Sequence, residues 1–396
     1  MSESTHSANV ATVARNATLD DLVELLKAQH DVKFDAAVPA QAIRSTQGVL
    51  LVAGMGPDGP HGEPGVFRPT EIADGHLADK LGIPTPYLRT LRNERVDIYD
   101  ANVNGWLQGP AGGDPDGRNF LARTFRPLQP SGEGIFRALQ SDRFARLDNL
   151  DFLVAALQGV QEADAEVEVI ACDLSERGMR MRVAAPGVRA LAPVLLDRYR
   201  APEVSDRLAQ TYAQRQRWGA TDEPVVWGGF DLSNSETGHG AVSVCPVFTV
   251  PVCRNGMKIT TDALRRTHLG GQLDQGIVRW SDETQQRNVE LVTSMARDAV
   301  TTFLDADYVA MALEPIEERA GKRLKNPAET VKVVANQLRF SDAVAEGVLA
   351  HFISGGQDTA GGILNALTSF AQTVESPDLA DELESEALRA LEIAAA

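Results

Sequence analysis

Two pairs of strand-like segments in the middle of the chain constrain its fold more than any other feature. Residues 167–172 and 179–184 alternate apolar and polar side chains, and the Gly-containing turn 175–178 that joins them is typical of a hairpin. Residues 225–232 and 241–252 form a second pair, connected through residues 233–240. We therefore expect antiparallel β-hairpins in this part of the chain.

Helical patterns follow the β-rich part. From Ser281 onward, apolar residues recur at helical spacing. Asn326 and Pro327 have the form of a helix start, and Ser341 begins a further helix that the glycines at 355–356 end. The expected fold class is α+β: antiparallel hairpins or a sheet packed by helices, with a helical C-terminal part.

Gly/Pro-rich loops at residues 54–65 and 109–117 punctuate the first part of the chain, and we place the strongest boundary at the second loop. The sequence divides into four regions: a disordered tail (1–18), an N-terminal α/β region with Gly/Pro loops (19–117), an α+β core domain (118–372) and an acidic helical tail (373–396).

The charge balance limits the kinds of partner. The chain has 55 acidic and 38 basic residues, a net charge of −17, which argues against nucleic-acid binding by a generally basic surface. Seven acidic residues lie between Glu375 and Glu392, against Arg389 alone. Any DNA contact must therefore be local, and the acidic tail is expected to meet partner proteins or to compete with DNA.

No targeting or membrane signal is evident. The first 18 residues are polar, and no apolar run approaches the roughly 18 residues that span a bilayer. The three cysteines, Cys172, Cys245 and Cys253, form no C-x-x-C pair and are interpreted as buried thiols. These features predict a cytoplasmic protein without membrane contact.

Catalytic and cofactor motifs are not found. The histidines form no metal-binding pair, and there is no phosphate-binding loop, nucleophile elbow or dinucleotide fingerprint. We expect no catalytic residue, no metal and no cofactor. Whether the protein is an enzyme stays open, with the balance against it.

Three segments carry a family resemblance. The first runs from Phe136 to Asn149, the second from Ser233 through Gly238 to Met257, and the third from Asp358 to Thr368. In this order they resemble the phage/plasmid-like uncharacterised protein family known as domain of unknown function 932. The resemblance covers roughly residues 119–372 and implies a phage or mobile-element context, without an established activity. The motif residues are Asp142, Asn149, Asn234, Ser235, Glu236, Gly238, Gly256, Asn365 and Thr368. The chain departs from the family at Gly361, where we expect tryptophan, and at Gln372, where histidine is usual.

Two cation-rich stretches are candidates for phosphate contact. In the first, residues 118–146, arginines are interleaved with Phe120, Phe125, Phe136 and Phe144, which suits single-stranded nucleic acid because guanidinium pairs with phosphate while rings stack on bases. In the alternative, these phenylalanines are core residues. The second stretch covers residues 254–268, and its alternative interpretation is a solvated face. The candidate nucleic-acid-binding residues are Arg137, Arg143, Arg146, Arg254, Asn255, Lys258, Arg265 and Arg266.

Two weaker candidates remain. Glu236, with His239, has the residue types of an acid/base or metal site, but a turn stabilised by its own side chains explains the same pattern. Residues 77–91 resemble a helix-turn-helix that would place residues 85–92 in a major groove, where Arg89 and Arg92 would meet phosphates, but an ordinary helical corner fits equally well.

The leading functional hypothesis is a non-enzymatic phage or mobile-element protein that binds and anneals single-stranded DNA in recombination or replication. The hairpin-then-helix order is reminiscent of strand-annealing proteins, and a homo-oligomeric ring or filament is expected. Its partners would include host or phage replication proteins, bound through the acidic tail. The alternative is a host-protein-binding protein, anti-defence or regulatory, that works through an acidic surface. A third hypothesis is an enzyme built on Glu236, Asp142 and Asn365.

Overall fold

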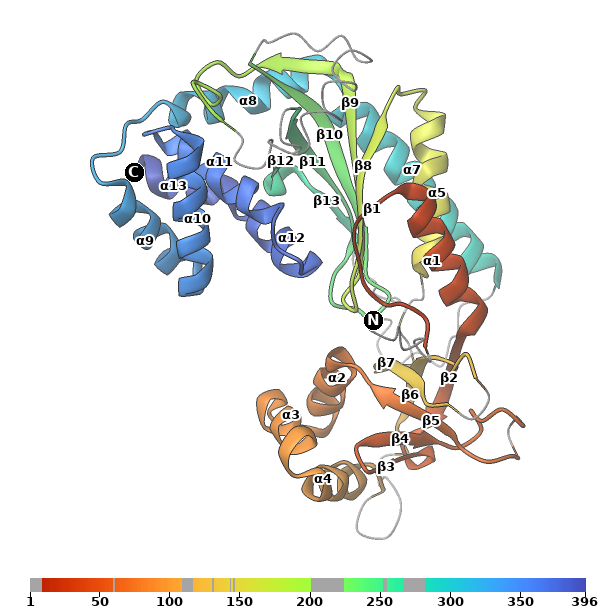
Figure 1. The fold of residues 1–396 in the computed structure, drawn as a ribbon. Helices are drawn as coiled ribbons and strands as arrows, with labels where there is room; N and C mark the ends of the chain where they lie inside the picture. Colours follow the sequence, from red (N-terminus) through yellow and green to blue (C-terminus); the bar gives the residue numbers. More distant parts are fainter. Residues whose placement is uncertain are drawn as a thin grey trace, which may run out of the picture.

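The computed structural model describes residues 9–59, 61–108, 117–129, 132–142, 144, 147–200, 224–251, 255–266 and 282–396. Within this part the protein is an α+β fold with two β-sheets, as expected from the hairpin and helix patterns (Figure 1). Among the described helices, none combines the length and apolar character needed to cross a membrane.

The larger sheet, sheet A, is antiparallel and forms the centre of the core domain. Its order is β1-β8-β9-β10-β11-β12, and β13 also pairs with β11. Both predicted hairpins are present as β8–β9 and β10–β11. The strands are β1 (Ala14–Ala17), β8 (Glu168–Leu174), β9 (Met179–Leu191), β10 (Val225–Asn234), β11 (Val242–Val250), β12 (Asn255–Lys258) and β13 (Leu264–Arg266).

Helices cover both faces of sheet A (Figure 1). On one face lie α1 (Leu19–Val32), α5 (Asn149–Glu162) and α7 (Asp282–Phe303). On the other face lie α8 (Ala306–Ala320), α11 (Ala360–Ala371), α12 (Pro377–Ser385) and α13 (Ala387–Ala395). The helices α9 (Pro327–Leu338) and α10 (Asp342–Gly355) pack on this layer through α11 and α13. Each group buries its own apolar core against the sheet.

Local capping explains where several helices begin. Thr18 forms a reciprocal capping box with Asp21 at the start of α1. The predicted caps Asn326 and Ser341 accept backbone hydrogen bonds at the starts of α9 and α10, and Gly356 ends α10 in the left-handed conformation. These boundaries follow from sequence chemistry alone.

The N-terminal domain contains the second sheet, sheet B, in the order β2-β6-β7-β5-β4-β3. Its strands are β2 (Lys33–Pro39), β3 (Ile43–Thr46), β4 (Val49–Val52), β5 (Gly65–Pro69), β6 (Asn119–Phe125) and β7 (Gly134–Ser141). The helices α2 (Glu71–Leu81), α3 (Thr85–Glu94) and α4 (Val96–Gln108) pack with it. The short 3-10 helix η1 (Ala40–Ala42) lies in this domain, and η2 (Thr260–Asp262) lies beside β11 in the core domain.

Three predicted boundaries are corrected by this arrangement. The division at 117/118 is wrong, because β6 and β7 pair with β2 and β5 in sheet B. The tail 1–18 is not wholly disordered, because β1 pairs with β8. The region 373–396 is helical as expected, but it packs into the core instead of extending as a tail, since Leu383 and Leu391 are buried.

Candidate functional site at the domain junction

A charge-balanced ion-pair network joins the two domains. We call it the junction network, and it consists of Lys33, Asp35, Arg123 and Arg137 of the N-terminal domain with Asp148 and Glu236 of the core domain. Register places Asp35 opposite Arg123 on β2 and β6, and Arg123 Nε lies 2.7 Å from Asp35 Oδ2. The Arg123 side chain is fully buried. A buried charge of this kind requires its partners, so the network fixes how the domains meet.

Glu236 bonds to residues of both domains. One carboxylate oxygen pairs with Arg137, and the other accepts the backbone N–H of Asn149 at 2.6 Å, at the N-terminus of α5. The Glu236 carbonyl accepts hydrogen bonds from Arg123 and from Gln140. Both carboxylate oxygens are therefore committed within the protein, which favours the structural interpretation of this turn over an acid/base role.

The neighbouring turn residues hold two hairpin ends together. Ser235 donates a hydrogen bond to the Arg177 carbonyl at 2.5 Å, and Thr237 donates to the same carbonyl at 3.0 Å. Gly238 has φ of +80°, in the left-handed region that glycine adopts at low cost. Asn234 donates to Asn149 Oδ1 at 2.8 Å. The first two motifs of the resemblance thus meet at the junction network.

Electrostatics stabilise the ionised form of this network. Burial alone raises the pKa of Asp148, but the charges of Arg123 and Lys33 outweigh that effect and hold the pKa below its ordinary range. Arg137 also stacks over the Phe125 ring at 4.0 Å. A small pocket lined by Arg137, Glu236 and Glu176 lies beside the network.

A second charge-balanced network lies on sheet A beneath α12. We call it the sheet network. Strand alternation directs Met181 and Phe230 to one face of the sheet, and it directs the charged residues that adjoin them in sequence to the other face. Its members are Arg15, Asp173, Arg180, Arg182, Asp231, Lys258, Asp381 and Glu384.

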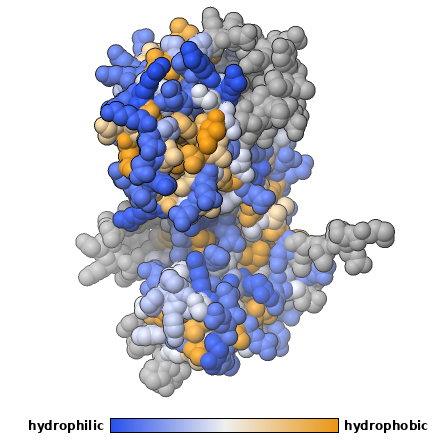
Figure 2. Space-filling view, turned by 60° about the vertical axis from the view of Figure 1, so that its left-hand side comes forward, coloured by the Kyte–Doolittle hydropathy of each residue, from blue (hydrophilic) through white to orange (hydrophobic). Residues whose placement is uncertain are grey.

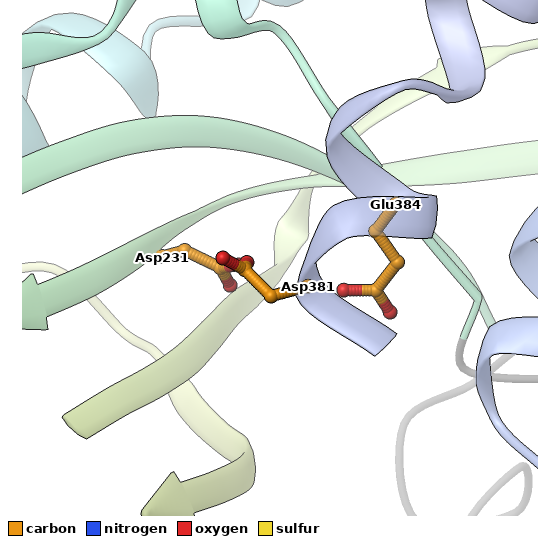
Figure 3. Close-up of side chains that lie close together, drawn as sticks. All are labelled: Asp231, Asp381 and Glu384. Carbon is orange, nitrogen blue, oxygen red and sulfur yellow. The ribbon is translucent and has the colours of Figure 1, made fainter. Parts of the chain in front are cut away.

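Three carboxylates of the sheet network lie close enough together to suggest a metal site. Oxygens of Asp231, Asp381 and Glu384 lie within 4.8 Å of one another, with Asp231 on a strand and the other two on one helix (Figure 3). However, Lys258 Nζ lies 2.9 Å from Asp231 and also pairs with Asp381. Arg182 pairs with Asp231 and Glu384. Protein cations already balance these carboxylates, so the cluster does not call for a metal ion.

The predicted phosphate-binding cations do not form one accessible face. Arg137 and Lys258 are 7% and 6% exposed and are held in ion pairs, which corrects their assignment as DNA contacts. Lys258 lies beneath the region that was expected to be an acidic tail, because its partner Asp381 belongs to α12. Arg143, Arg146 and Arg254 lie outside the described residues. Asn255, Arg265 and Arg266 are described only as backbone, in β12 and β13.

The alternative interpretations hold for the remaining candidates in the N-terminal domain. Phe120, Phe125 and Phe136 are buried, as in the core interpretation of the Arg/Phe stretch. Arg89 and Arg92 donate hydrogen bonds to the carbonyls of residues 71 and 69, which favours a helical corner over a DNA-reading helix. Cys172 and Cys245 are buried as predicted, while Cys253 lies outside the described residues.

The other motif residues occupy separate places. Asn365 donates hydrogen bonds to the Leu195 carbonyl and to Gln357, and the Thr368 hydroxyl bonds within α11. Asp142 is exposed at the end of β7. The enzyme hypothesis built on Glu236, Asp142 and Asn365 is therefore not supported, because Glu236 bonds to Arg137 and Asn149 in the junction network, whereas Asn365 bonds to Leu195 and Gln357 beneath α11.

The two positions at which the chain departs from the resemblance have local explanations. A Cβ on Gly361 would lie 2.9 Å from Ala320 Cβ, so this packing leaves no room for a larger side chain. Gln372 donates to Glu384 Oε1 at 2.8 Å and thereby supports the sheet network. Sequence reasoning missed Arg123, Arg182 and Asp231 as network members. Their only signal was a charged residue with apolar residues close by on both sides within a strand-like segment.

Comparison with known proteins adds no relative: no protein-family model, no curated protein and no solved structure matches this chain.

Proposed function

We propose that this protein is a non-enzymatic interaction protein whose acidic surface binds a basic region of a partner protein, in the phage or plasmid context that the resemblance implies. The observation that carries this proposal is the burial of Arg137 and Lys258 in ion pairs. Such cations reach a phosphate backbone only by leaving carboxylates buried without partners, which costs about 3–5 kcal/mol for each pair.

The distribution of charge supports the same proposal. The junction network holds three cations and three carboxylates, and the sheet network holds four of each. Since both networks cancel, the net charge of −17 belongs to the rest of the chain. Residues 282–396 contain 20 acidic and 9 basic residues. The face in Figure 2 is largely hydrophilic around an apolar area in its upper part. An excess of acidic residues steers association with a basic partner, because the two surfaces carry opposite charge.

A fluorescence anisotropy experiment separates protein binding from DNA binding. The probes are a labelled oligo-lysine peptide and a labelled single-stranded oligonucleotide of equal length, measured at about 50 mM and about 200 mM salt. We expect the peptide to bind at low salt and to weaken with added salt, and the oligonucleotide not to bind. Oligonucleotide binding without peptide binding would reject the proposal.

Matched charge variants locate the binding surface. One variant replaces four exposed carboxylates of the C-terminal helices: Glu314→Gln, Glu318→Gln, Glu382→Gln and Glu392→Gln. The control replaces four exposed carboxylates elsewhere: Glu24→Gln, Asp58→Asn, Glu63→Gln and Glu94→Gln. Both variants lose the same charge, so a difference between them reports the position of the removed carboxylates. Only the first variant is expected to weaken peptide binding strongly. Equal weakening would mean that the peptide senses net charge alone.

Single-stranded DNA binding is the second candidate function. It is supported by the pairing of both β12 and β13 with β11, which places Asn255, Arg265 and Arg266 along one sheet edge. Oligonucleotide binding in the same assay that disappears in an Arg265→Ala/Arg266→Ala variant would favour this candidate over protein binding.

A further inference from the structure

Two histidines stack on each other across the boundary between the domains. His76 lies on α2 of the N-terminal domain, and His239 lies in the connection between β10 and β11 of the core domain. Their ring centroids are 5.3 Å apart and their planes differ by 11°. The Nδ1 atom of His76 is buried and has no hydrogen-bond partner among the described residues. Neutral imidazole rings can adopt this arrangement, whereas two imidazolium rings would repel each other.

Charged groups from four elements face the pair. Lys80 and Asp79 of α2 act on His76. Arg177 of the β8–β9 turn, Asp378 of α12 and Arg89 of α3 act on His239. The cations outnumber the carboxylates by three to two in this set. The surroundings therefore disfavour a further positive charge on either ring.

Burial acts in the same direction as these charges. Burial lowers the pKa of His76 to about 4, and the neighbouring His239 and Lys80 add to the effect. His239 is more exposed than His76, and the partial burial of its ring, followed by the charge of Arg177, lowers its pKa. Both rings are thus neutral in the closed junction at neutral pH.

The junction network responds differently to acid. Its bonds require ionised carboxylates, and the pKa of Asp148 is held below the ordinary range by Arg123 and Lys33, against the opposing effect of burial. This network therefore persists at a pH where exposed histidines are already protonated. The two domains are joined by one contact that resists mild acid and another that is sensitive to it.

We propose that the His76–His239 stack is an acid-sensitive latch between the domains, with the junction network as the hinge. Neutral rings hold α2 against the core domain. Protonation of the pair separates this side of the junction while Arg123, Asp148 and Glu236 keep the other side together.

The expected response follows from proton linkage. A latch histidine that is exposed in the open state has an ordinary pKa of about 6.5, against about 4 for stacked His76. The ratio of open to closed molecules therefore increases about tenfold between about pH 7.5 and about pH 5.5, from His76 alone. The closed state is favoured above the open-state pKa and loses this advantage as the pH falls.

Single-molecule energy transfer tests the latch at concentrations too low for association near the isoelectric point of about 4.9. Dyes are attached through non-natural residues at the exposed positions Glu63 and Glu382 of the full chain. We expect the open population to increase on going from about pH 7.5 to about pH 5.5. An unchanged distribution would overturn the proposal.

Two variants assign the response to the stacked pair. His76→Phe with His239→Phe retains two stacked aromatic rings but cannot be protonated, so its energy transfer is expected to be the same at both pH values. The control His30→Phe alters an exposed histidine on α1 and is expected to keep the wild-type response. A pH response that survives in the double variant would reject the latch.

A second measurement does not depend on the variants folding. Histidine proton resonances of the wild-type protein report each pKa during an acid titration. We expect His76 to titrate well below the ordinary pKa of histidine. Titration of His76 and His239 at the ordinary value would overturn the proposal.

Discussion

The guanidinium of Arg182, on β9, fills the space that a side chain on Gly256 would need, although Gly256 lies on β12, three strands along sheet A. A Cβ built on Gly256 would lie 2.4 Å from Arg182 Nη1. Arg182 cannot withdraw easily, because it is held by Asp231 and Glu384. The small residue of the second sequence motif is therefore required by a buried ion pair, a reason that the motif itself does not reveal.

Gly256→Ala is expected to destabilise the protein. The added methyl group displaces Arg182 from its carboxylates, and overpacking of this kind costs about 1–3 kcal/mol. Urea unfolding followed by circular dichroism measures the change. Gly105→Ala is the control, since Gly105 lies in α4 with no neighbouring atom within 4 Å of the added Cβ. The control is expected to be stabilised by about 0.5–1 kcal/mol, as alanine favours a helix.

Glu384→Gln tests the sheet network. The side chain of Glu384 is 1% exposed and pairs with both Arg180 and Arg182. Removing its charge leaves buried cations short of a partner, so the free energy of unfolding is expected to fall by about 3–5 kcal/mol. Glu382→Gln on the same helix is exposed and is expected to change stability by less than about 0.5 kcal/mol. Equal effects of the two substitutions would show that the sheet network contributes nothing specific.

Arg123→Met tests the junction network. Methionine is apolar, and it leaves Asp35 and Asp148 without their shared guanidinium. We expect a loss of about 3–5 kcal/mol in unfolding experiments, with the domain junction opening first in hydrogen exchange. The exposed Arg44→Met on β3 is the control and is expected to be nearly neutral. Unchanged exchange at the junction in Arg123→Met would contradict the role of this network.

Asp74 is expected to make stability depend on pH. Burial raises its pKa to about 6, against the opposing charge of Arg92. Because the folded pKa lies above the unfolded value, this contribution to stability is complete below about pH 4 and is lost as the pH rises through about 6, amounting to up to about 3 kcal/mol. Urea unfolding at several pH values should show this dependence in the wild type but not in Asp74→Asn.

Asp58→Asn is the control for Asp74, since Asp58 is exposed. The difference between wild type and each variant removes the contribution of all other carboxylates. A wild-type curve that parallels that of Asp74→Asn would contradict the shifted pKa of Asp74.

Local patterns predicted the elements of this fold well. Asn326 and Ser341 identified the starts of α9 and α10, and the turn at 175–178 identified the β8–β9 hairpin. These features depend on hydrogen bonds and periodicities within a few residues, so the local sequence is enough to predict them. The boundary at 117/118 failed for the complementary reason: β6 joins β2 only through pairing over a long stretch of chain.

The sequence by itself determined the α+β class, the hairpins, several helix ends and the excess of acidic residues. Tertiary structure alone decided what the cations do. Arg182 and Lys258 meet Glu384 and Asp381 across more than a hundred residues of chain, so no local spacing reveals the pairs. Whether a charged side chain faces water or a buried partner depends on which element covers it, and here α12 covers the charged face of sheet A.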